Sequence, residues 1–214
     1  PFSANEAITA SPGGATGTYI STVNTAASIT TGTKSILITG SKDAQTIGLG
    51  ATGANLHIVD SELQRMTAGS GLVLGGATAS AGSMTVNGIT AAGSNNLSPV
   101  VTLVAHDNGA PVTFDTAGST FNALEVQADD GVEVKKDITT DTGGMYLDGD
   151  KDNSNASPDG VNSVVFTDGR TITAKTVLTL EATTGAIVAV GSLTLQAGVG
   201  IVILDDLTST SSGN

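Results

Sequence analysis

The chain of 214 residues contains no cysteine and no tryptophan, and only 3% of its residues are aromatic. Without cysteine, the protein can form no disulfide, use no thiolate nucleophile and bind no metal through sulfur. Aromatic side chains bury about 150–250 Å² each, so their scarcity argues against a wide globular interior. We therefore expect a narrow core that is filled by Ile, Leu, Val and Ala.

Basic residues are also scarce. The chain has 8 Lys and Arg against 20 Asp and Glu, which gives a formal net charge of -12. A surface this acidic repels phosphate backbones, so we expect no nucleic-acid partner and an affinity for divalent cations or basic surfaces instead. No apolar run approaches the roughly 20 residues that cross a bilayer, and we expect no membrane span.

Short alternating apolar segments between Gly, Asn, Asp, Ser and Thr are abundant. The clearest are centred on 36–38, 72–74, 84–86, 101–103, 124–126, 178–180, 193–195 and 201–203. Such alternation predicts about sixteen short strands with one buried face. Spacings of 8 to 20 residues with almost no helical signal favour an all-β solenoid whose coils hold about 20 residues each. The alternative is a β-sandwich, which explains the strands but not the scarcity of aromatic residues.

The solenoid is expected to occupy residues 28–207. Residues 1–27 are predicted to be a lead-in or edge segment, and residues 208–214 a polar tail or a link to a next unit; both ends look uncapped, as in a piece of a longer protein. One helical turn is predicted at 60–66, where acidic and hydroxyl side chains come first. Segments 177–182 and 192–197 nearly repeat each other.

An acidic loop insertion at 148–163 contains the strongest candidate metal ligands. Asp148, Asp150 and Asp152 alternate in a polar loop, and Asp159 stands eleven residues after the first. Oxygen ligands at positions 1, 3, 5 and 12 of a loop suit Ca²⁺, although position 6 is Asn153 where an EF-hand has Gly. Two interpretations stay open: a calcium site, or a solvated loop whose Asp and Asn residues simply favour turns.

Other motifs have simple structural interpretations. The glycines of 48–53 match a dinucleotide-binding fingerprint, but a strand rather than the required helix is predicted to follow. His57 and His106 are far apart, and His57 lies in that predicted strand. We therefore interpret the glycine motif as a turn, and His57 as a surface or edge residue of a strand.

Paired carboxylates raise the alternative of a carbohydrate-active β-helix. Adjacent acidic residues occur at 129–130 and 205–206, and such an enzyme would also need a groove with clustered carboxylates and a basic residue such as Arg65 or Arg170. Neighbouring residues of a strand point to opposite faces, and both pairs stand beside turn formers. Structural turns are the favoured interpretation.

Three segments carry a resemblance to a known group of proteins. Residues 41–49, 60–69 and 166–176 resemble repeat units of very large secreted proteins of diatoms and related heterokont algae. The middle segment, together with the apolar triplet at Leu72, is similar to units of filamentous haemagglutinin-type adhesins. The resemblance covers 28–207 and implies a secreted, right-handed parallel β-helix that acts as a fibre, sheath or adhesive. The irregular coil lengths and the acidic insertion depart from the tidier bacterial pattern.

These observations together predict a structural protein rather than an enzyme. We expect a repeat unit of an extracellular filament, sheath or cell-surface adhesin that stacks end to end with neighbouring copies or units. Cell-surface or extracellular polysaccharide is a further expected partner, and calcium is the expected cofactor of the acidic loop. A carbohydrate-active β-helix and a calcium-dependent binding module are the alternatives.

Overall fold

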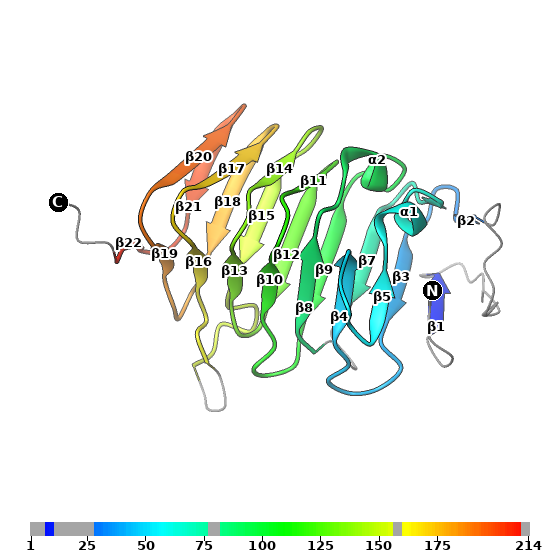
Figure 1. Ribbon diagram of the computed structural model, residues 1–214, viewed down its shortest axis with the longest axis horizontal. Helices are drawn as coiled ribbons and strands as arrows, with labels where there is room; N and C mark the ends of the chain where they lie inside the picture. The colour runs from blue at the N-terminus through cyan, green and yellow to red at the C-terminus, as the bar shows by residue number, and fades with distance from the viewer. Residues whose placement is uncertain (1–6, 11–27, 77–81, 156–159, 211–214) are drawn as a thin grey trace.

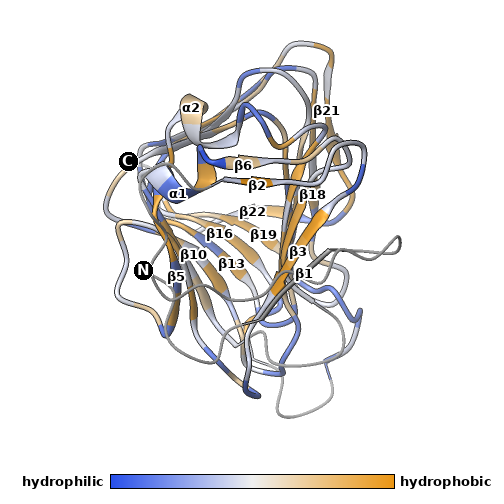
Figure 2. Ribbon diagram, turned by 90° about the vertical axis from the view of Figure 1, so that its right-hand side faces the viewer, coloured by the Kyte–Doolittle hydropathy of each residue, from blue (hydrophilic) through white to orange (hydrophobic). Residues whose placement is uncertain are grey.

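The computed structural model describes residues 7–10, 28–76, 82–155 and 160–210. It is an elongated stack of coils, with 45% of residues in strands and 5% in helices (Figure 1). The strands form three faces around one interior, as the view along the stack shows (Figure 2). The all-β class with parallel sheets is confirmed, and the arrangement is that of a β-solenoid.

The strands are grouped by face. Face 1 contains, in spatial order, β1 (Ala7–Ala10), β3 (Ile36–Thr39), β7 (Leu72–Gly75), β9 (Val101–Ala105), β12 (Leu124–Ala128), β15 (Met145–Asp148), β18 (Val177–Glu181) and β21 (Gly200–Ile203). Face 2 contains β5 (Leu56–Ile58), β4 (Ile47–Gly50), β8 (Met84–Asn87), β10 (Val112–Phe114), β13 (Val132–Val134), β16 (Val164–Phe166), β19 (Ile187–Ala189) and β22 (Leu207–Ser209). Face 3 contains β11 (Ser119–Phe121), β14 (Ile138–Thr140), β17 (Arg170–Ala174) and β20 (Leu193–Ala197), and a separate pair is formed by β2 (Ile29–Thr30) and β6 (Met66–Thr67).

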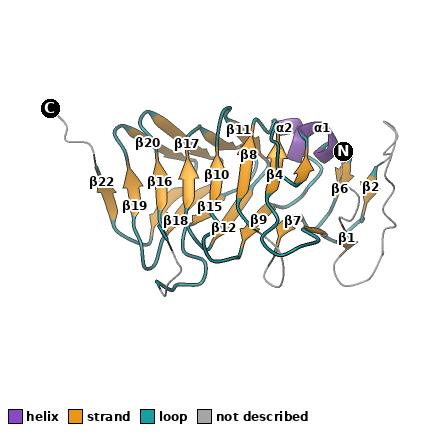
Figure 3. Ribbon diagram, turned by 60° about the horizontal axis from the view of Figure 1, so that its bottom comes forward, coloured by secondary structure: helices purple, strands orange, loops and turns teal. Residues whose placement is uncertain are grey.

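Each coil visits face 1 and then face 2, and the coils that begin with β9, β12, β15 and β18 also add a strand on face 3 before the chain returns to face 1. The coils follow one another as β3–β4, β7–β8, β9–β10, β12–β13, β15–β16, β18–β19 and β21–β22. Figure 3 shows the strands side by side along the stack. Within the described residues, all strand pairs but one are parallel; the exception is β1, which pairs antiparallel with β3. Parallel pairing between coils excludes the antiparallel sheets of the sandwich alternative.

The strand register measures the length of a coil. Val101 pairs with Leu124, which in turn pairs with Met145, so each of these coils is close in length to the prediction of about 20 residues. Met145 pairs with Leu178 across a much longer coil, because the acidic insertion lies between β15 and β16. The insertion therefore lengthens one coil without interrupting the stack.

The near repeat in the sequence does not mark successive coils. Its two segments form β18 and β20, which lie on faces 1 and 3 of the solenoid. The true partner of β18 in the following coil is β21, with Leu178 beside Ile201. Strands on two different faces share the same apolar alternation, so they resemble a repeat in the sequence although they are not equivalent positions of successive coils.

Alternating side chains build the interior. Most strands carry a buried residue at every second position, and the same position in successive coils stacks into a column. One column on face 1 runs through Leu74, Leu103, Val126, Leu147 and Leu180, all at most 1% exposed. The core is aliphatic as predicted, with the addition of three buried phenylalanines, Phe114, Phe121 and Phe166.

Two single-turn helices occur in the early coils. The first, α1 (Asp60–Leu63), was predicted, and its Glu62 carboxylate accepts the N–H of Val59 at 3.1 Å. The second, α2 (Ala91–Ser94), has no helical pattern in its sequence. Asp60 fixes the residue that precedes α2, because its carboxylate accepts both the N–H and the hydroxyl of Thr90, at 2.9 and 2.8 Å. No helix among the residues that the structure describes is long and apolar enough to cross a membrane.

Candidate functional site

The predicted metal ligands lie where face 1 passes into the acidic insertion. Asp148 is the last residue of β15, and Asp150 and Asp152 follow in the turn; Asp159 lies outside the described residues. Asp148 and Asp150 are 7% and 0% exposed, whereas Asp152 is exposed. The three carboxylates therefore differ sharply in their contact with solvent.

Asp148 is hydrogen-bonded within the protein through both carboxylate oxygens. Its Oδ1 accepts the N–H of Asp150 at 2.9 Å, and its Oδ2 accepts the hydroxyl of Tyr146 at 3.3 Å. The hydroxyl of Tyr146 also donates to Glu181 Oε2 at 2.5 Å. Asp148 and Glu181 are register partners on β15 and β18, so parallel pairing itself brings their carboxylates together. We call Tyr146, Asp148 and Glu181 the acidic cluster.

Burial and mutual repulsion change the proton affinities of this cluster. Burial raises the pKa of Asp148 from 3.8 to about 6, against the lowering effect of the Asp150 N–H, and the neighbouring charge of Glu181 raises it further. Burial, with the hydrogen bond to Glu181, also raises the pKa of Tyr146. Asp148 can thus exchange a proton near neutral pH, which is the property of a general acid or of a pH-sensitive contact.

Asp150 is the most deeply placed of the described acidic residues in the insertion. Its Oδ2 accepts the backbone N–H of Thr184, while its Oδ1 is buried without a hydrogen-bond partner. Asp152, by contrast, forms a local turn in which Oδ1 accepts the N–H of Ser154 at 2.9 Å. Within the described part of the chain, no three His, Cys, Asp or Glu side chains form a group that could hold a metal. Calcium binding stays a prediction.

In each of the acidic pairs at 129–130 and 205–206, one carboxylate hydrogen-bonds a backbone N–H, as expected of residues in structural turns. Asp130 accepts the N–H of Val161 at 2.6 Å and thereby anchors the insertion to the turn after β12. Asp205 accepts the N–H of Ala182 at 2.6 Å and so links the last two coils. Both carboxylates hold backbone between coils.

The glycine motif and the histidines also have structural roles. Residues 48–53 lie in β4 and the turn to β5, so a strand follows as expected. His57 on β5 lies 2.9 Å from the carbonyl oxygen of Gly50 through Nε2, and Nδ1 of His106 lies 3.3 Å from Nζ of Lys151. Arg170 belongs to face 3, where it contacts Asp137 at 3.4 Å, so it does not join the acidic cluster on face 1.

A second candidate site is the end of the stack at β20, β21 and β22. Ile201, Ile203 and Leu207 are 42%, 39% and 48% exposed there. Their register partners in the preceding coil are all fully buried, namely Leu178, Leu180 and Ile187. We call Leu193, Leu195, Ile201, Ile203 and Leu207 the open coil face. Leu195, Ile201, Ile203 and Leu207 continue core columns, because their register partners are buried, and Leu193 lies beside them on β20 as the register partner of Arg170.

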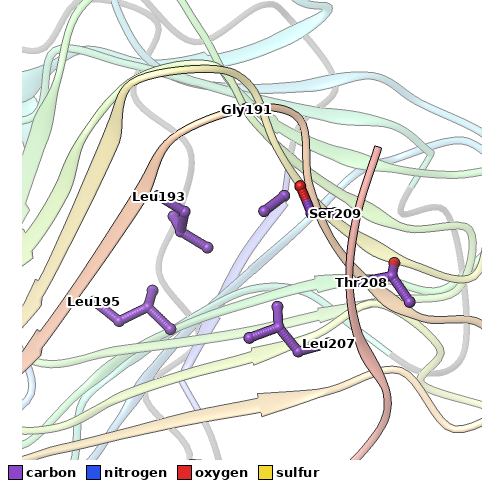
Figure 4. A pocket seen from close by; sticks show the side chains of 7 residues that line it. Gly191, Leu193, Leu195, Leu207, Thr208 and Ser209 are labelled. Carbon is purple, nitrogen blue, oxygen red and sulfur yellow. The ribbon is translucent and has the colours of Figure 1, made fainter. Parts of the chain in front are cut away.

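A shallow pocket marks the open coil face. It is lined by Ala189, Gly191, Leu193, Leu195, Leu207, Thr208 and Ser209 (Figure 4). The leucine side chains reach into it from β20 on one side and from β22 on the other. Such a surface can bind apolar side chains from another strand layer, while the edges of β20, β21 and β22 that no other described strand covers offer backbone donors and acceptors.

Sequence reasoning missed several residues that contact the predicted acidic ligands. Tyr146 and Glu181 were not predicted because they are 35 residues apart and meet only through the register of β15 and β18. Thr184 was missed because it is 34 residues from Asp150 and meets it only in the folded chain. The one available signal was the outward position of Tyr146 and Glu181 in their alternating segments.

Comparison with known proteins identifies no relative, since no protein-family model, no curated protein and no solved structure matches the chain.

Proposed function

We propose that this chain is a non-enzymatic structural unit of a β-solenoid filament, which stacks end to end with further units of the same protein. The observation that carries the proposal is the open coil face, where Ile201, Ile203 and Leu207 continue buried core columns yet are 42%, 39% and 48% exposed. Burying them would remove apolar surface from water at about 25 cal/mol per Å². We expect the filament in an extracellular sheath or cell-surface adhesin, in line with the sequence resemblance.

The occupant that fits this surface best is another coil of the same kind. Ile201, Ile203 and Leu207 each continue a column of aliphatic residues, so the next layer should present Ile, Leu or Val at the same register. The free strand edges of β20, β21 and β22 would then pair with three strands of that layer. At the opposite end of the stack, β1 and β5 are the terminal strands of faces 1 and 2 among the described residues, and a neighbouring unit would pair there.

The mechanical properties of such a filament follow from the fold. Hydrogen bonds between coils run along the stack, with strands about 4.8 Å apart. A continuous aliphatic interior adds resistance to separation of the coils. The acidic surface, with a net charge of -12, would keep the filament hydrated and attract cations or basic partners.

The test is assembly of the purified chain, followed by analytical ultracentrifugation and cryo electron microscopy. We expect concentration-dependent oligomers and rods with an axial repeat of about 4.8 Å. Ile201→Lys should abolish assembly by placing a charge in the new core, while leaving the monomer folded. Val161→Lys is the matched control, because Val161 is 61% exposed and lies in the acidic insertion, outside the open coil face. Monodisperse monomers at all concentrations, or equal loss in both variants, would refute end-to-end stacking.

A second candidate function is polysaccharide cleavage, which the acidic cluster favours. Asp148 and Glu181 share one tyrosine hydroxyl, and the pKa of Asp148, at about 6, suits a general acid. The basic residue Arg170 is on another face, which weighs against this function. Release of reducing ends from polysaccharides by the wild-type chain, with loss of that activity in Asp148→Asn, would support it over the structural function.

A further inference from the structure

The turn after β15 contains a carboxylate that is fully shielded from solvent. Asp150 is 0% exposed, and its Oδ2 accepts the N–H of Thr184 while Oδ1 has no hydrogen-bond partner. No salt bridge of the described residues involves Asp150. Lys151, the adjacent cation, directs its ammonium group to His106 at 3.3 Å. Burial of a carboxylate with one hydrogen bond and no counter-charge is unfavourable, because the lost hydration is not replaced.

A second unpartnered oxygen belongs to the same corner. Asn162 is 4% exposed, and its amide nitrogen donates to Ser154 O at 2.5 Å and to Thr184 Oγ1 at 3.0 Å, which leaves Oδ1 without a partner. Thr184 joins the two side chains, since its N–H donates to Asp150 and its hydroxyl accepts from Asn162. Asp150 and Asn162 therefore each form a hydrogen bond with Thr184, and each keeps one buried side-chain oxygen without a hydrogen-bond partner. Buried oxygens are normally satisfied, so two in one corner call for a ligand.

Further negative charge surrounds this corner. Asp148 holds the N–H of Asp150, and the charge of Asp150 contributes to raising the pKa of Asp148. Gln127 and Asp148 are register partners, and the N–H of Lys151 donates to Ala128 O at 3.0 Å, so the end of β12 lies beside this corner in the preceding coil. Asp129 is also buried, at 1% exposed. A water molecule could satisfy the bare oxygens, but only a cation would also offset the charge.

We propose that this corner binds a calcium ion, with Asp150 Oδ1 as the charged ligand and Asn162 Oδ1 as the neutral ligand. Carboxylate and amide oxygens are the ligands that Ca²⁺ takes in proteins, and neither the exposed Asp152 nor the hydrogen-bonded oxygens of Asp148 are required. The ion would join the two ends of the insertion, because Asp150 follows β15 and Asn162 precedes β16. The site stands on these contacts alone and is independent of end-to-end stacking.

The first test is calorimetric titration of chelator-treated protein with CaCl2, together with its thermal unfolding. We expect saturable binding by the wild-type chain and a rise in its unfolding temperature. Asp150→Asn should weaken binding by at least about tenfold, because it removes the charged ligand. Asp152→Asn makes the same change of charge at an exposed neighbour and should bind like the wild type. Asn162→Ala should weaken binding without altering net charge.

The second test locates the ion on the unmodified chain, in case Asp150→Asn does not fold. The chain has no Trp and two Tyr, and Tyr146 lies four residues before Asp150. Terbium in place of calcium should therefore luminesce when tyrosine is excited, and Tyr146→Phe should remove the signal while calorimetry still detects Ca²⁺. No binding by the wild type up to about 1 mM Ca²⁺ would overturn the proposal. Equal weakening in the Asp150 and Asp152 variants would overturn it too, because it would indicate diffuse surface attraction.

Discussion

The hydroxyl of Tyr146 donates to Glu181 Oε2 at 2.5 Å, across the boundary between two coils. The same hydroxyl lies 3.3 Å from Asp148 Oδ2, so one donor serves two carboxylates. Parallel pairing of β15 with β18 creates this arrangement, because Asp148 and Glu181 are direct register partners. Like charges at such a position repel, and the cluster is therefore a place where stability depends on pH.

Stability should fall as the pH rises through the range in which Asp148 loses its proton. The pKa of Asp148 is 3.8 in an unperturbed chain and about 6 in the folded protein, so the folded state binds the proton more tightly. The favourable contribution is complete below pH 3.8 and is lost as pH rises through about 6. After discounting for solvent screening, we expect about 1 kcal/mol between about pH 4 and pH 7.

Urea unfolding of the wild type and of Asp148→Asn at both pH values measures this contribution. The wild type should lose about 1 kcal/mol more stability than the variant as the pH rises. Other carboxylates titrate in both proteins and cancel in the comparison. Identical pH dependence of the two proteins would show that Asp148 titrates alike in the folded and unfolded states.

Tyr146→Phe removes the donor that the two carboxylates share. We expect a loss of about 1–3 kcal/mol in the free energy of unfolding, because Asp148 and Glu181 would each lose a hydrogen bond. The pKa of Asp148 should also rise, since this hydroxyl lowers it. Urea unfolding and an NMR titration of the Asp148 carboxyl group measure the two effects. Thr179→Val is the control, because Thr179 is the register partner of Tyr146 but no member of the acidic cluster; equal effects in both variants would contradict this role.

Short-range patterns made the strands predictable from the sequence. Alternation in segments such as 101–103 and 124–126 reports burial of every second side chain, and both form strands of face 1. The low aromatic content correctly indicated a mainly aliphatic core, although three phenylalanines are also buried in it. The helical turn α1 was predictable because Glu62 can cap its own backbone within three residues.

Contacts between coils could not be predicted in the same way. Helix α2 depends on Asp60, which is 30 residues before Thr90, and its own sequence of Ala, Gly and Ser carries no helical signal. The acidic loop was recognised from its spacing, but the burial of Asp150 depends on Thr184, 34 residues later. Coils of unequal length, such as those that separate β4 from β8 and β10 from β13, hide these pairings from any search for a fixed repeat.

Packing of large against small residues on face 2 gives the next prediction. Phe114 stacks between Val86 and Val134 in its column, and all three are at most 1% exposed. Phe114→Ala should cost about 3–5 kcal/mol, because the aliphatic neighbours cannot fill the cavity. Thr113→Ala, one residue away on the outer side, should cost less than about 1 kcal/mol. Chemical denaturation of both variants measures the difference, and similar losses would argue that the interior is loosely packed.

Glycines at the ends of strands and in turns should tolerate substitution very differently. Gly75 at the end of β7 has a φ of 90°, and a Cβ there would overlap the carbonyl oxygen of Val104 in the next coil. Gly32 also has a positive φ, of 62°, but a Cβ there would have no atom within 4 Å. Gly75→Ala should therefore force β7 and β9 apart and cost more than about 3 kcal/mol. Gly32→Ala should cost about 1–2 kcal/mol, the strain of the left-handed backbone alone.

Denaturant unfolding of the two alanine variants separates backbone strain from crowding between coils. Since both positions carry the strain of a positive φ, the difference between the two variants measures how closely coils approach at Gly75. A close approach is expected there because the carbonyl of Val104 belongs to β9, which is paired with β7 in register. Equal costs at the two sites would mean that adjacent coils can separate locally without loss of stability, and the coils would then not act as one cooperative stack.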